Sequence, residues 1–409
     1  MSHGFIAAPK DAPLDPITGL DQLFRDDPSP AKINLVVGVW QNDNGESPVL
    51  NTVKKAEERL LRTETSKSYL PMAGESRFLE VVHELVFGEG GASALSGRAA
   101  SLQAPGGTGA LRLAAEFIFD HRPEATVWIT SPAYPNHKGI FESVGLRTDS
   151  YRYYDVASGT LTLHEALGDL ERARPGDVVI LHGCCHNPSG ADLAVEQWRS
   201  LAALLAARNL VPLIDLAYLG FARSLAEDSA GARIMLAACG EGIVTTSFSK
   251  NFALYGERVG VVTFVSETPA AARACVERTK TYARRIYSSP PAHGSRIVME
   301  ILSDPELRQA WVHEVTGMRQ RLKAARLLFS NGLAAHQVDR RVAPSLIENV
   351  GMFALTRLTA AHVTRLKDRH HVYMLPNGRL SVAGIRTATM EHLCSSVADV
   401  LKHEPLPDV

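Results

Sequence analysis

The stretch Ile243-Val244-Thr245-Thr246-Ser247-Phe248-Ser249-Lys250 begins as an apolar run and ends on a lone lysine. We expect its first part to form a buried strand, and the serines and Lys250 to lie in the loop that follows. A second strand-like run upstream leads into Asp215, with Tyr218 close behind, and a third ends shortly before Asn187. The sequence therefore predicts four polar residues near the C-terminal ends of three strands.

The fold class follows from a regular alternation of strand-like and helix-like segments. The strand-like runs are residues 126–129, 178–181, 211–214, 243–245 and 260–265. Between the second and third runs, segment 193–208 has apolar residues at helical spacing, and Asp192 is the expected N-cap. Strands separated by helices predict an α/β fold with a mostly parallel sheet buried on both faces. Ligands bind beyond the C-terminal ends of such strands, where the polar residues gather.

These polar residues suit one cofactor, pyridoxal 5'-phosphate. The cofactor needs an amine for its aldehyde, which Lys250 offers. It needs a carboxylate at its ring nitrogen, so that the protonated ring acts as an electron sink, and Asp215 offers this. It also needs donors at its phenolic oxygen, which favour the charged form of that oxygen, and Asn187 and Tyr218 offer these.

A phosphate group would find donors in two further places. The glycine-rich turn Gln103-Ala104-Pro105-Gly106-Gly107-Thr108-Gly109-Ala110 precedes an expected helix over residues 111–119. Free amides and the helix dipole attract an anion at such a helix start. Arg258 and the serines beside Lys250 would add further donors.

Each of these motifs has an ordinary alternative when it is taken alone. A lysine near serines is usually a solvated surface residue, and Asp215 could simply cap the next element. The glycine run 106–109 does not spell the dinucleotide fingerprint. The histidines and cysteines of segment 182–186 could suggest a metal, but adjacent cysteines rarely share a tetrahedral site, so no metal is expected. The joint occurrence of the motifs, in order, favours the cofactor.

With these motifs in place, the chain resembles the aspartate aminotransferase family, the fold-type I aminotransferases with aspartate and aromatic members. The similarity runs from about Asp15 to near the C-terminus. The matching stretches are residues 32–35, 38–39, 105–112, 135–137, 182–188, 249–252, 257–260, 287–294 and 351–353. The resemblance implies a large pyridoxal-phosphate domain, with helices flanking a mostly parallel sheet, and a smaller α/β domain. The expected divisions are an arm over 1–13, the small domain over 14–48 and 320–409, and the large domain over 49–319.

The resemblance also assigns roles at the cofactor. Lys250 matches the lysine that forms a Schiff base with the cofactor and moves the substrate proton. Asp215 matches the partner of the ring nitrogen, and His137 the histidine that orients this carboxylate. Tyr134 stands where an aromatic ring stacks on the cofactor. Donors to the phenolic oxygen are implied at Asn187 and Tyr218, and contacts to the phosphate at Gly107, Thr108, Ser247, Ser249 and Arg258.

Two more residues are implied to act between subunits, so the resemblance predicts a homodimer. Tyr69 matches a tyrosine that reaches the phosphate of the neighbouring subunit. Arg284 aligns with the arginine that crosses the dimer to a distal carboxylate, in a register fixed by the run Tyr287-Ser288-Ser289-Pro290-Pro291. Arg379 matches the arginine that binds the substrate α-carboxylate within one subunit.

The chain departs from the family pattern around the substrate side chain. Tyr134 replaces a frequent tryptophan, Thr18 stands where an aliphatic residue commonly covers the pocket, and Ser289 replaces a frequent asparagine. The substrate contacts implied on this side are Gly38, Asn187, Tyr134 and Thr18. The chemistry should be retained, while an acidic, an aromatic or an unusual acidic substrate all remain open.

Composition narrows the remaining possibilities. The chain has 409 residues and a formal net charge of −1, and no basic run with interleaved aromatics, so neither nucleic acid nor a charged membrane surface is expected as a partner. Its five cysteines read as reduced thiols, and no apolar stretch is long enough to span a membrane. The N-terminus lacks the pattern of a signal peptide, so a cytoplasmic location is expected.

The leading hypothesis is an aminotransferase that moves an amino group between an amino acid and a 2-oxo acid, such as 2-oxoglutarate, by a ping-pong mechanism. One alternative keeps the cofactor and predicts a β-eliminating or decarboxylating lyase. Another is a non-catalytic binding protein on the same scaffold, which the complete set of Lys250, Asp215 and Arg379 disfavours.

Overall fold

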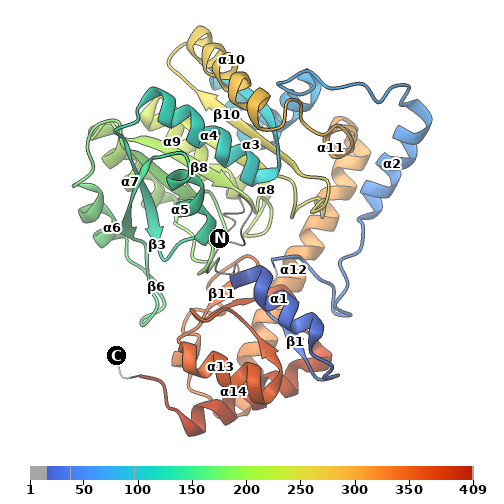
Figure 1. Ribbon diagram of the computed structural model, residues 1–409, viewed down its shortest axis with the longest axis vertical. Coiled ribbons are helices and arrows are strands. Elements are labelled where there is room, and N and C mark those ends of the chain that lie inside the picture. Colours follow the sequence, from blue (N-terminus) through green and yellow to red (C-terminus); the bar gives the residue numbers. More distant parts are fainter. Residues whose placement is uncertain (1–15, 37, 96, 408–409) are drawn as a thin grey trace, which may run out of the picture.

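A computed structural model describes residues 16–407 of the chain, apart from 37 and 96 (Figure 1). The arm expected over residues 1–13 lies outside the described residues. The described part contains a seven-stranded sheet and, below it in Figure 1, a smaller group of helices and short strands. The long helix α12 (Pro305–Ala335) runs from the first body into the second. None of the described helices combines the length and apolarity needed to cross a membrane.

The large sheet has the strand order β2-β10-β9-β8-β7-β3-β4. Its strands are β2 (Ala99–Pro105), β3 (Thr126–Ser131), β4 (Arg147–Arg152), β7 (Val178–His182), β8 (Val211–Leu216), β9 (Gly242–Ser247) and β10 (Val259–Val265). The five strands from β9 to β4 are parallel, and β10 is antiparallel to both of its neighbours. The predicted α/β class with a mostly parallel sheet is confirmed.

Both faces of this sheet are covered, which explains why its central strands are apolar throughout. Along β7, Val178 and Ile180 belong to one apolar cluster, whereas Val179 and Leu181 belong to the other, because successive side chains point to opposite faces. Helices α4 (Gly106–His121), α5 (Pro135–Glu142) and α10 (Pro269–Ile286) contribute to the first cluster. Helices α7 (Val195–Ala207) and α9 (Ala230–Cys239) contribute to the second.

The expected cap of α7 is wrong. The helix begins at Val195, after Ala194, so Asp192 lies too far upstream to cap it. Instead, an Asp192 carboxylate oxygen accepts a hydrogen bond from the backbone N–H of His186 at 3.2 Å. Burial raises the pKa of Asp192 to about 6. This acid therefore holds the loop after β7, which carries Asn187, instead of the helix.

The smaller body is built on two short sheets. Strand β1 (Ile33–Asn34) pairs in parallel with β12 (Val372–Tyr373), and β11 (Phe353–Leu355) pairs antiparallel with β13 (Arg379–Ser381). Around them pack α1 (Pro16–Asp26), α13 (Ala360–His370) and α14 (Met390–His403). The other described elements are α2 (Asn51–Thr63), α3 (Ser76–Ala94), β5 (Tyr154–Asp155), β6 (Thr160–Leu161), α6 (Leu163–Leu170), α8 (Leu225–Asp228), α11 (His293–Ser303) and three short 3-10 turns.

Candidate active site

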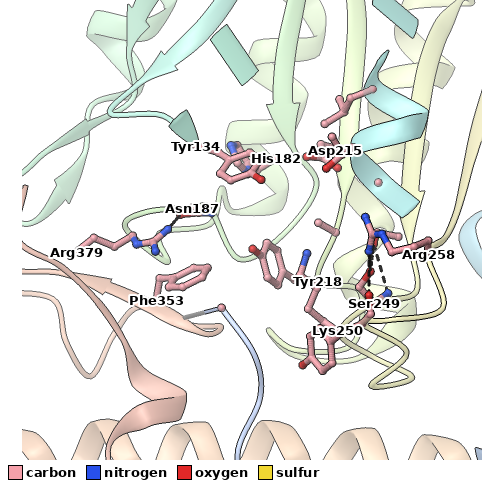
Figure 2. A pocket seen from close by; sticks show the side chains of 17 residues that line it. Tyr134, His182, Asn187, Asp215, Tyr218, Ser249, Lys250, Arg258, Phe353 and Arg379 are labelled. Carbon is pink, nitrogen blue, oxygen red and sulfur yellow. Dashed lines mark hydrogen bonds between the residues drawn. The ribbon is translucent and has the colours of Figure 1, made fainter. Parts of the chain in front are cut away.

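A cavity of about 270 Å³ lies between the C-terminal edge of the large sheet and the smaller body (Figure 2). Gly38, Phe353 and Arg379 reach it from the segments outside the large sheet. The sequence-predicted residues that line it are Gly38, Gly107, Thr108, Tyr134, Asn187, Asp215, Tyr218, Ser247, Ser249, Lys250, Arg258 and Arg379. The structure thus brings together most of the residues that the sequence singles out.

Asp215, near the end of β8, is a buried carboxylate held by two neighbours. His137 Nε2 lies 3.1 Å from its Oδ2 atom, and the Thr245 hydroxyl donates to Oδ1 at 3.1 Å. Burial raises the pKa of this carboxyl, but the hydrogen bond of His137 and the neighbouring positive charge of Lys250 are among the effects that outweigh it and lower the pKa overall. Asp215 is therefore an anion at neutral pH, as the partner of a protonated ring nitrogen must be.

Lys250 follows β9, and its amine lies 4.8 Å from the centre of the Tyr218 ring. Burial lowers the pKa of the Lys250 amine, the Asp215 charge raises it, and the Arg258 charge lowers it, with a net lowering. Burial also raises the pKa of the Tyr218 hydroxyl, which stays protonated as a hydrogen-bond donor. An amine with a lowered pKa is more often neutral and so better able to accept a proton or attack a carbonyl.

The start of α4 forms a cradle for an anion. The helix begins at Gly106, five residues earlier than expected, and Gly106 adopts a φ of +75°, which favours glycine. A Cβ atom there would lie 2.4 Å from Arg258 Nη2. Arg258 Nη1 donates to the Ser249 hydroxyl at 3.4 Å and to the Tyr255 carbonyl at 3.1 Å. Free helix amides, hydroxyls and a guanidinium therefore converge on one end of the cavity, as a phosphate requires.

Arg379, at the start of β13, lies at the opposite end of the cavity and is almost fully buried (Figure 2). Its Nη2 donates to the Val36 carbonyl at 2.9 Å, its Nη1 to Asn187 Oδ1 at 3.4 Å, and its guanidinium lies 4.3 Å from the Phe353 ring centre. Its Nε has no hydrogen-bond partner, and none of the ion pairs found within the described chain involves Arg379. A buried guanidinium without a counter-ion is suited to a bound carboxylate.

Five lining residues were not predicted as site residues. They are Leu111, Ala217, Tyr255, His182 and Phe353. His182 lies in a matching family stretch and at the end of β7, and these were the signals available for it. The His182 Nε2 atom is buried and has no hydrogen-bond partner among the described residues. Burial together with neighbouring histidines lowers the pKa of His182 well below its usual range. No group of three or more His, Cys, Asp or Glu side chains suited to a metal is found within the described residues.

Phe353 supports the carboxylate end of the cavity. A Cβ atom on Gly38 would lie 2.9 Å from the Phe353 ring, so only glycine leaves that ring in place above Arg379. Phe353 was part of a matching family stretch, which was the signal available for it.

Four predicted residues lie away from this cavity within one chain. His137 is buried behind Asp215. Thr18, on α1, and Arg284, near the C-terminal end of α10, are both exposed. Tyr69 is 94% exposed. The roles assigned to these residues stay predictions, and those of Tyr69 and Arg284 require a second subunit.

The residues present fit pyridoxal phosphate at both of its ends and at its aldehyde. The cradle at α4 suits the phosphate, buried Asp215 suits the ring nitrogen, and Lys250 lines the same cavity with its amine available for the aldehyde. Fold and site together define a pyridoxal-phosphate enzyme of fold type I.

Comparison with known proteins gives the family. The model of the family described as aminotransferase class I and II matches residues 30–397. Aspartate aminotransferase of Escherichia coli K12 is 45% identical over 390 residues, 95% of this chain and 98% of that protein. An aromatic-amino-acid aminotransferase of Pseudomonas aeruginosa is 40% identical over 400 residues, 98% of this chain and 99% of that one. The chain belongs to the aminotransferase class I and II family.

A solved structure supports the same conclusion. The aromatic-amino-acid aminotransferase of Burkholderia pseudomallei, covalently bound to pyridoxal phosphate, superposes with a TM-score of 0.93 at 37% identity, covering 97% of this chain and 100% of that one. The protein is therefore a pyridoxal-phosphate-dependent aminotransferase, which transfers amino groups between amino acids and 2-oxo acids.

Proposed function

We propose that this aminotransferase acts on dicarboxylic substrates, with aspartate or glutamate as amino donor and a 2-oxo acid such as 2-oxoglutarate as acceptor. The observation that carries the amino-acid site is Arg379, a buried guanidinium that lines the cavity and forms no ion pair with the described residues, and the preference for a second carboxylate rests on Arg284. Arg379 binds the α-carboxylate that every substrate shares, and the Asn187 amide beside it helps to fix the orientation. Arg284 supplies the second positive charge, which a distal carboxylate needs.

Lys250 moves the proton. When bound, the cofactor supplies an electron sink, because its protonated ring nitrogen, paired with Asp215, stabilises negative charge at the substrate Cα. Lys250 Nζ accepts the proton from this carbon, and burial, which lowers the pKa of the amine, favours the neutral form that can do so. Asn187 and Tyr218 donate to the phenolic oxygen. His137 keeps Asp215 charged and oriented.

Around the cofactor and the substrate side chain, the other site residues take supporting roles. Gly107, Thr108, Ser247, Ser249 and Arg258 bind the phosphate. Tyr134, immediately before α5, covers the cofactor ring. Its own ring is edge-on to that of His137, with the two ring centres 5.2 Å apart. Gly38, Tyr134 and Thr18 face the substrate side chain.

The working unit is a homodimer. Tyr69 and Arg284 are exposed and lie outside their own cavity, which is the arrangement expected of residues that complete a partner's site. Exposed aromatic and arginine side chains are typical of interfaces.

The small domain comprises residues 14–48 and 320–409 and the large domain residues 49–319, so the boundary at 319 falls inside the continuous helix α12. The enzyme works in the cytoplasm.

A screen of half-reactions tests the substrate proposal. Purified protein loaded with pyridoxal phosphate is mixed with one amino acid at a time, and the absorbance of the bound cofactor is followed as it takes up the amino group. Rapid conversion with aspartate and glutamate is expected. Conversion with phenylalanine or tyrosine but not with aspartate would refute the dicarboxylic proposal and make Tyr134 the main determinant of specificity.

A further inference from the structure

The connection between α2 and α3, residues 64–75, is exposed at its centre and fixed at its ends. Residues 65–69 are all exposed, and Tyr69 points its ring into solvent with 94% of its surface accessible. Leu70 is buried again, and the N–H of Gln103 in β2 donates to the Ala73 carbonyl at 2.8 Å. An aromatic ring that is almost wholly exposed on a well-anchored segment is available for a contact with a second subunit, because aromatic side chains are enriched at interfaces.

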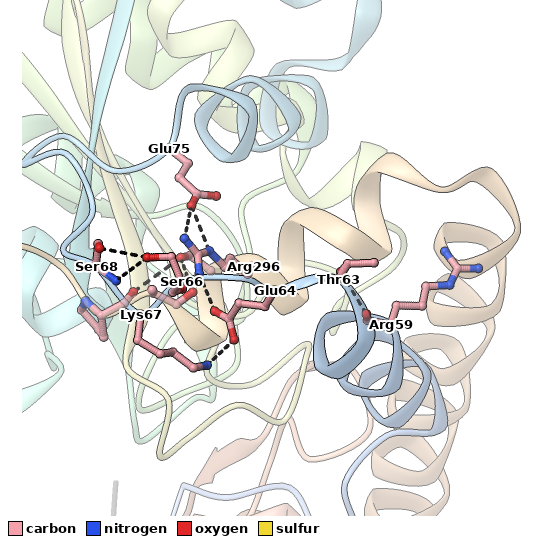
Figure 3. Close-up of polar contacts among 11 residues, drawn as sticks. Arg59, Thr63, Glu64, Ser66, Lys67, Ser68, Glu75 and Arg296 are labelled. Atoms are coloured by element: carbon pink, nitrogen blue, oxygen red, sulfur yellow. Dashed lines mark hydrogen bonds and ion pairs between the residues drawn. The ribbon is translucent and has the colours of Figure 1, made fainter.

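Arg296, on α11, joins the two ends of this connection (Figure 3). Its Nε and Nη2 atoms donate to Glu75 Oε1 at 2.9 and 2.8 Å, immediately before α3 begins. Its Nη1 atom donates to Glu64, the residue that follows α2, and to the Ser66 carbonyl at 3.4 Å. Lys67 binds Glu64 from the other side. One guanidinium therefore holds the first and the last residue of the segment that carries Tyr69.

These ion pairs are shielded from water. The side chains of Arg296, Glu64 and Glu75 are 18%, 13% and 25% exposed, so solvent screens their attraction only in part. Five donors in a planar fork allow arginine to serve both carboxylates at once in a fixed geometry. The cluster thus fixes the path of the connection before any partner arrives.

The same helix also follows the segment that carries Arg284. The Pro291 carbonyl accepts from Gln103 Nε2 at 2.7 Å, and the Tyr287 hydroxyl donates to the Gln103 carbonyl at 3.1 Å. Gln103, in turn, holds the Tyr69 connection through its backbone N–H. Both segments expected to reach the partner are therefore anchored on one unit of β2 and α11.

We propose that Arg296 is a positioning residue that fixes the Tyr69 segment in the geometry needed to complete the cofactor site of the partner subunit. This proposal rests on the proposed homodimer, and it assigns a role to a residue that does not line the cofactor cavity of either subunit. The physical reason is preorganisation: a segment that is already ordered loses less conformational freedom when Tyr69 meets the phosphate.

The first test measures how tightly pyridoxal phosphate binds. Arg296→Gln is expected to weaken its binding about tenfold, because charge-assisted hydrogen bonds that hold a contact residue are lost. The matched control is Arg59→Gln. The Arg59 side chain pairs with Glu300 and Asp304 in the same region, and the hydrogen bonds and ion pairs found among the described residues do not join it to the connection, so the control should bind the cofactor as the wild type does. Glu75→Gln replaces Arg296→Gln if the latter fails to fold.

A double variant separates positioning from general support. If Arg296 acts through Tyr69, the tenfold loss should vanish in a Tyr69→Phe background, because the hydroxyl that it positions is already gone. An Arg296→Gln effect that adds fully to the Tyr69→Phe effect would overturn the proposal.

Hybrid dimers, isolated with two affinity tags, decide which subunit is served. A Lys250→Ala subunit cannot be trapped by borohydride, so covalent trapping of pyridoxal phosphate on Lys250 reports only the other subunit's site. Pairing an Arg296→Gln subunit with a Lys250→Ala subunit should give wild-type affinity at the reporting site. Placing both changes in one subunit, opposite a wild-type one, should give the tenfold loss.

The reverse pattern, in which the defect stays with the subunit that carries Arg296→Gln, would overturn the proposal. Sedimentation of the wild type measures the oligomeric state independently. A wild-type monomer that binds the cofactor with full affinity would refute the proposed homodimer. A dimer whose hybrids show no loss of affinity in the subunit opposite Arg296→Gln would instead refute only the role of Arg296.

Discussion

Replacing Asp215 by asparagine removes one negative charge and changes almost nothing in volume. In the structure this carboxylate is buried, with His137 Nε2 at 3.1 Å and the Thr245 hydroxyl at 3.1 Å. An asparagine keeps an oxygen for one of these donors, so the fold should persist. It cannot hold a proton on the cofactor ring nitrogen, and the electron sink is lost.

The magnitude follows from the burial of the charge. Removing one member of a buried, hydrogen-bonded charge pair costs about 2–5 kcal/mol. If this energy is fully expressed at the transition state, Asp215→Asn should slow the half-reaction on the order of 30- to 5,000-fold. Substrate binding should change much less, because Arg379 lies at another part of the cavity.

Rapid mixing with saturating aspartate measures this rate from the absorbance of the bound cofactor. His137→Gln serves as the graded control, since it removes the imidazole that holds Asp215 but leaves the carboxylate, and a smaller loss is expected. A half-reaction of Asp215→Asn within threefold of the wild-type rate, with cofactor bound, would refute the role of Asp215 as partner of the ring nitrogen.

Three further outcomes are expected. Arg379→Leu should raise the KM for every amino acid on the order of 100-fold. Arg379→Lys keeps the charge but not the planar fork, so it should raise the KM less. An unchanged KM in steady-state kinetics would contradict the carboxylate site. Gly106→Ala should cost about 1–2 kcal/mol of folding stability, because its φ is +75°, and should also weaken phosphate binding by displacing Arg258; denaturant titration and cofactor titration measure the two effects. Hydrogen bonds led by the Ser29 backbone N–H lower the pKa of Asp27 from 3.8 to about 2, so the folded state favours the ionised form. Its contribution to stability is therefore present above about pH 4 and lost as the pH falls toward 2, and acid unfolding of Asp27→Asn should lack this component.

The sequence predicted the parts of the site that sit on strand ends. Asp215 and Lys250 follow apolar runs that form β8 and β9, and the edge at which parallel strands end is fixed by topology. The reversed direction of β10 was not predicted, because a buried strand is apolar whichever way it runs. The early start of α4 was missed as well, since Gly106 and Gly107 are poor helix formers, and Gly106 enters the helix at a φ of +75°, which favours glycine.

Residues that act by packing were harder to find than residues that carry charge. Phe353 supports Arg379 from a strand of three residues, too short for a periodic signal. Tyr255 lines the cavity from the turn after Lys250. Its hydroxyl accepts a hydrogen bond from the backbone N–H of Trp40 at 2.7 Å. Such contacts join segments far apart in the chain and leave no local pattern.

Arg296 shows the same limit from the side of charge. In sequence it is one arginine on an amphipathic helix, and an isolated arginine is ordinarily a surface charge. Only the structure brings it to Glu64 and Glu75, more than two hundred residues away, where it spans both ends of one connection.

A single-turnover reaction of cofactor-loaded protein with aspartate, run side by side on the wild type and on Lys250→Ala, tests most directly whether Lys250 carries out transamination at this site. The wild type should convert the bound cofactor completely and release one equivalent of 2-oxo acid per site. The rate for Lys250→Ala should be lower by several orders of magnitude, with partial rescue by an added small amine. Equal rates for the two proteins, or no 2-oxo acid from the wild type with aspartate or glutamate, would contradict the assigned activity and the role of Lys250.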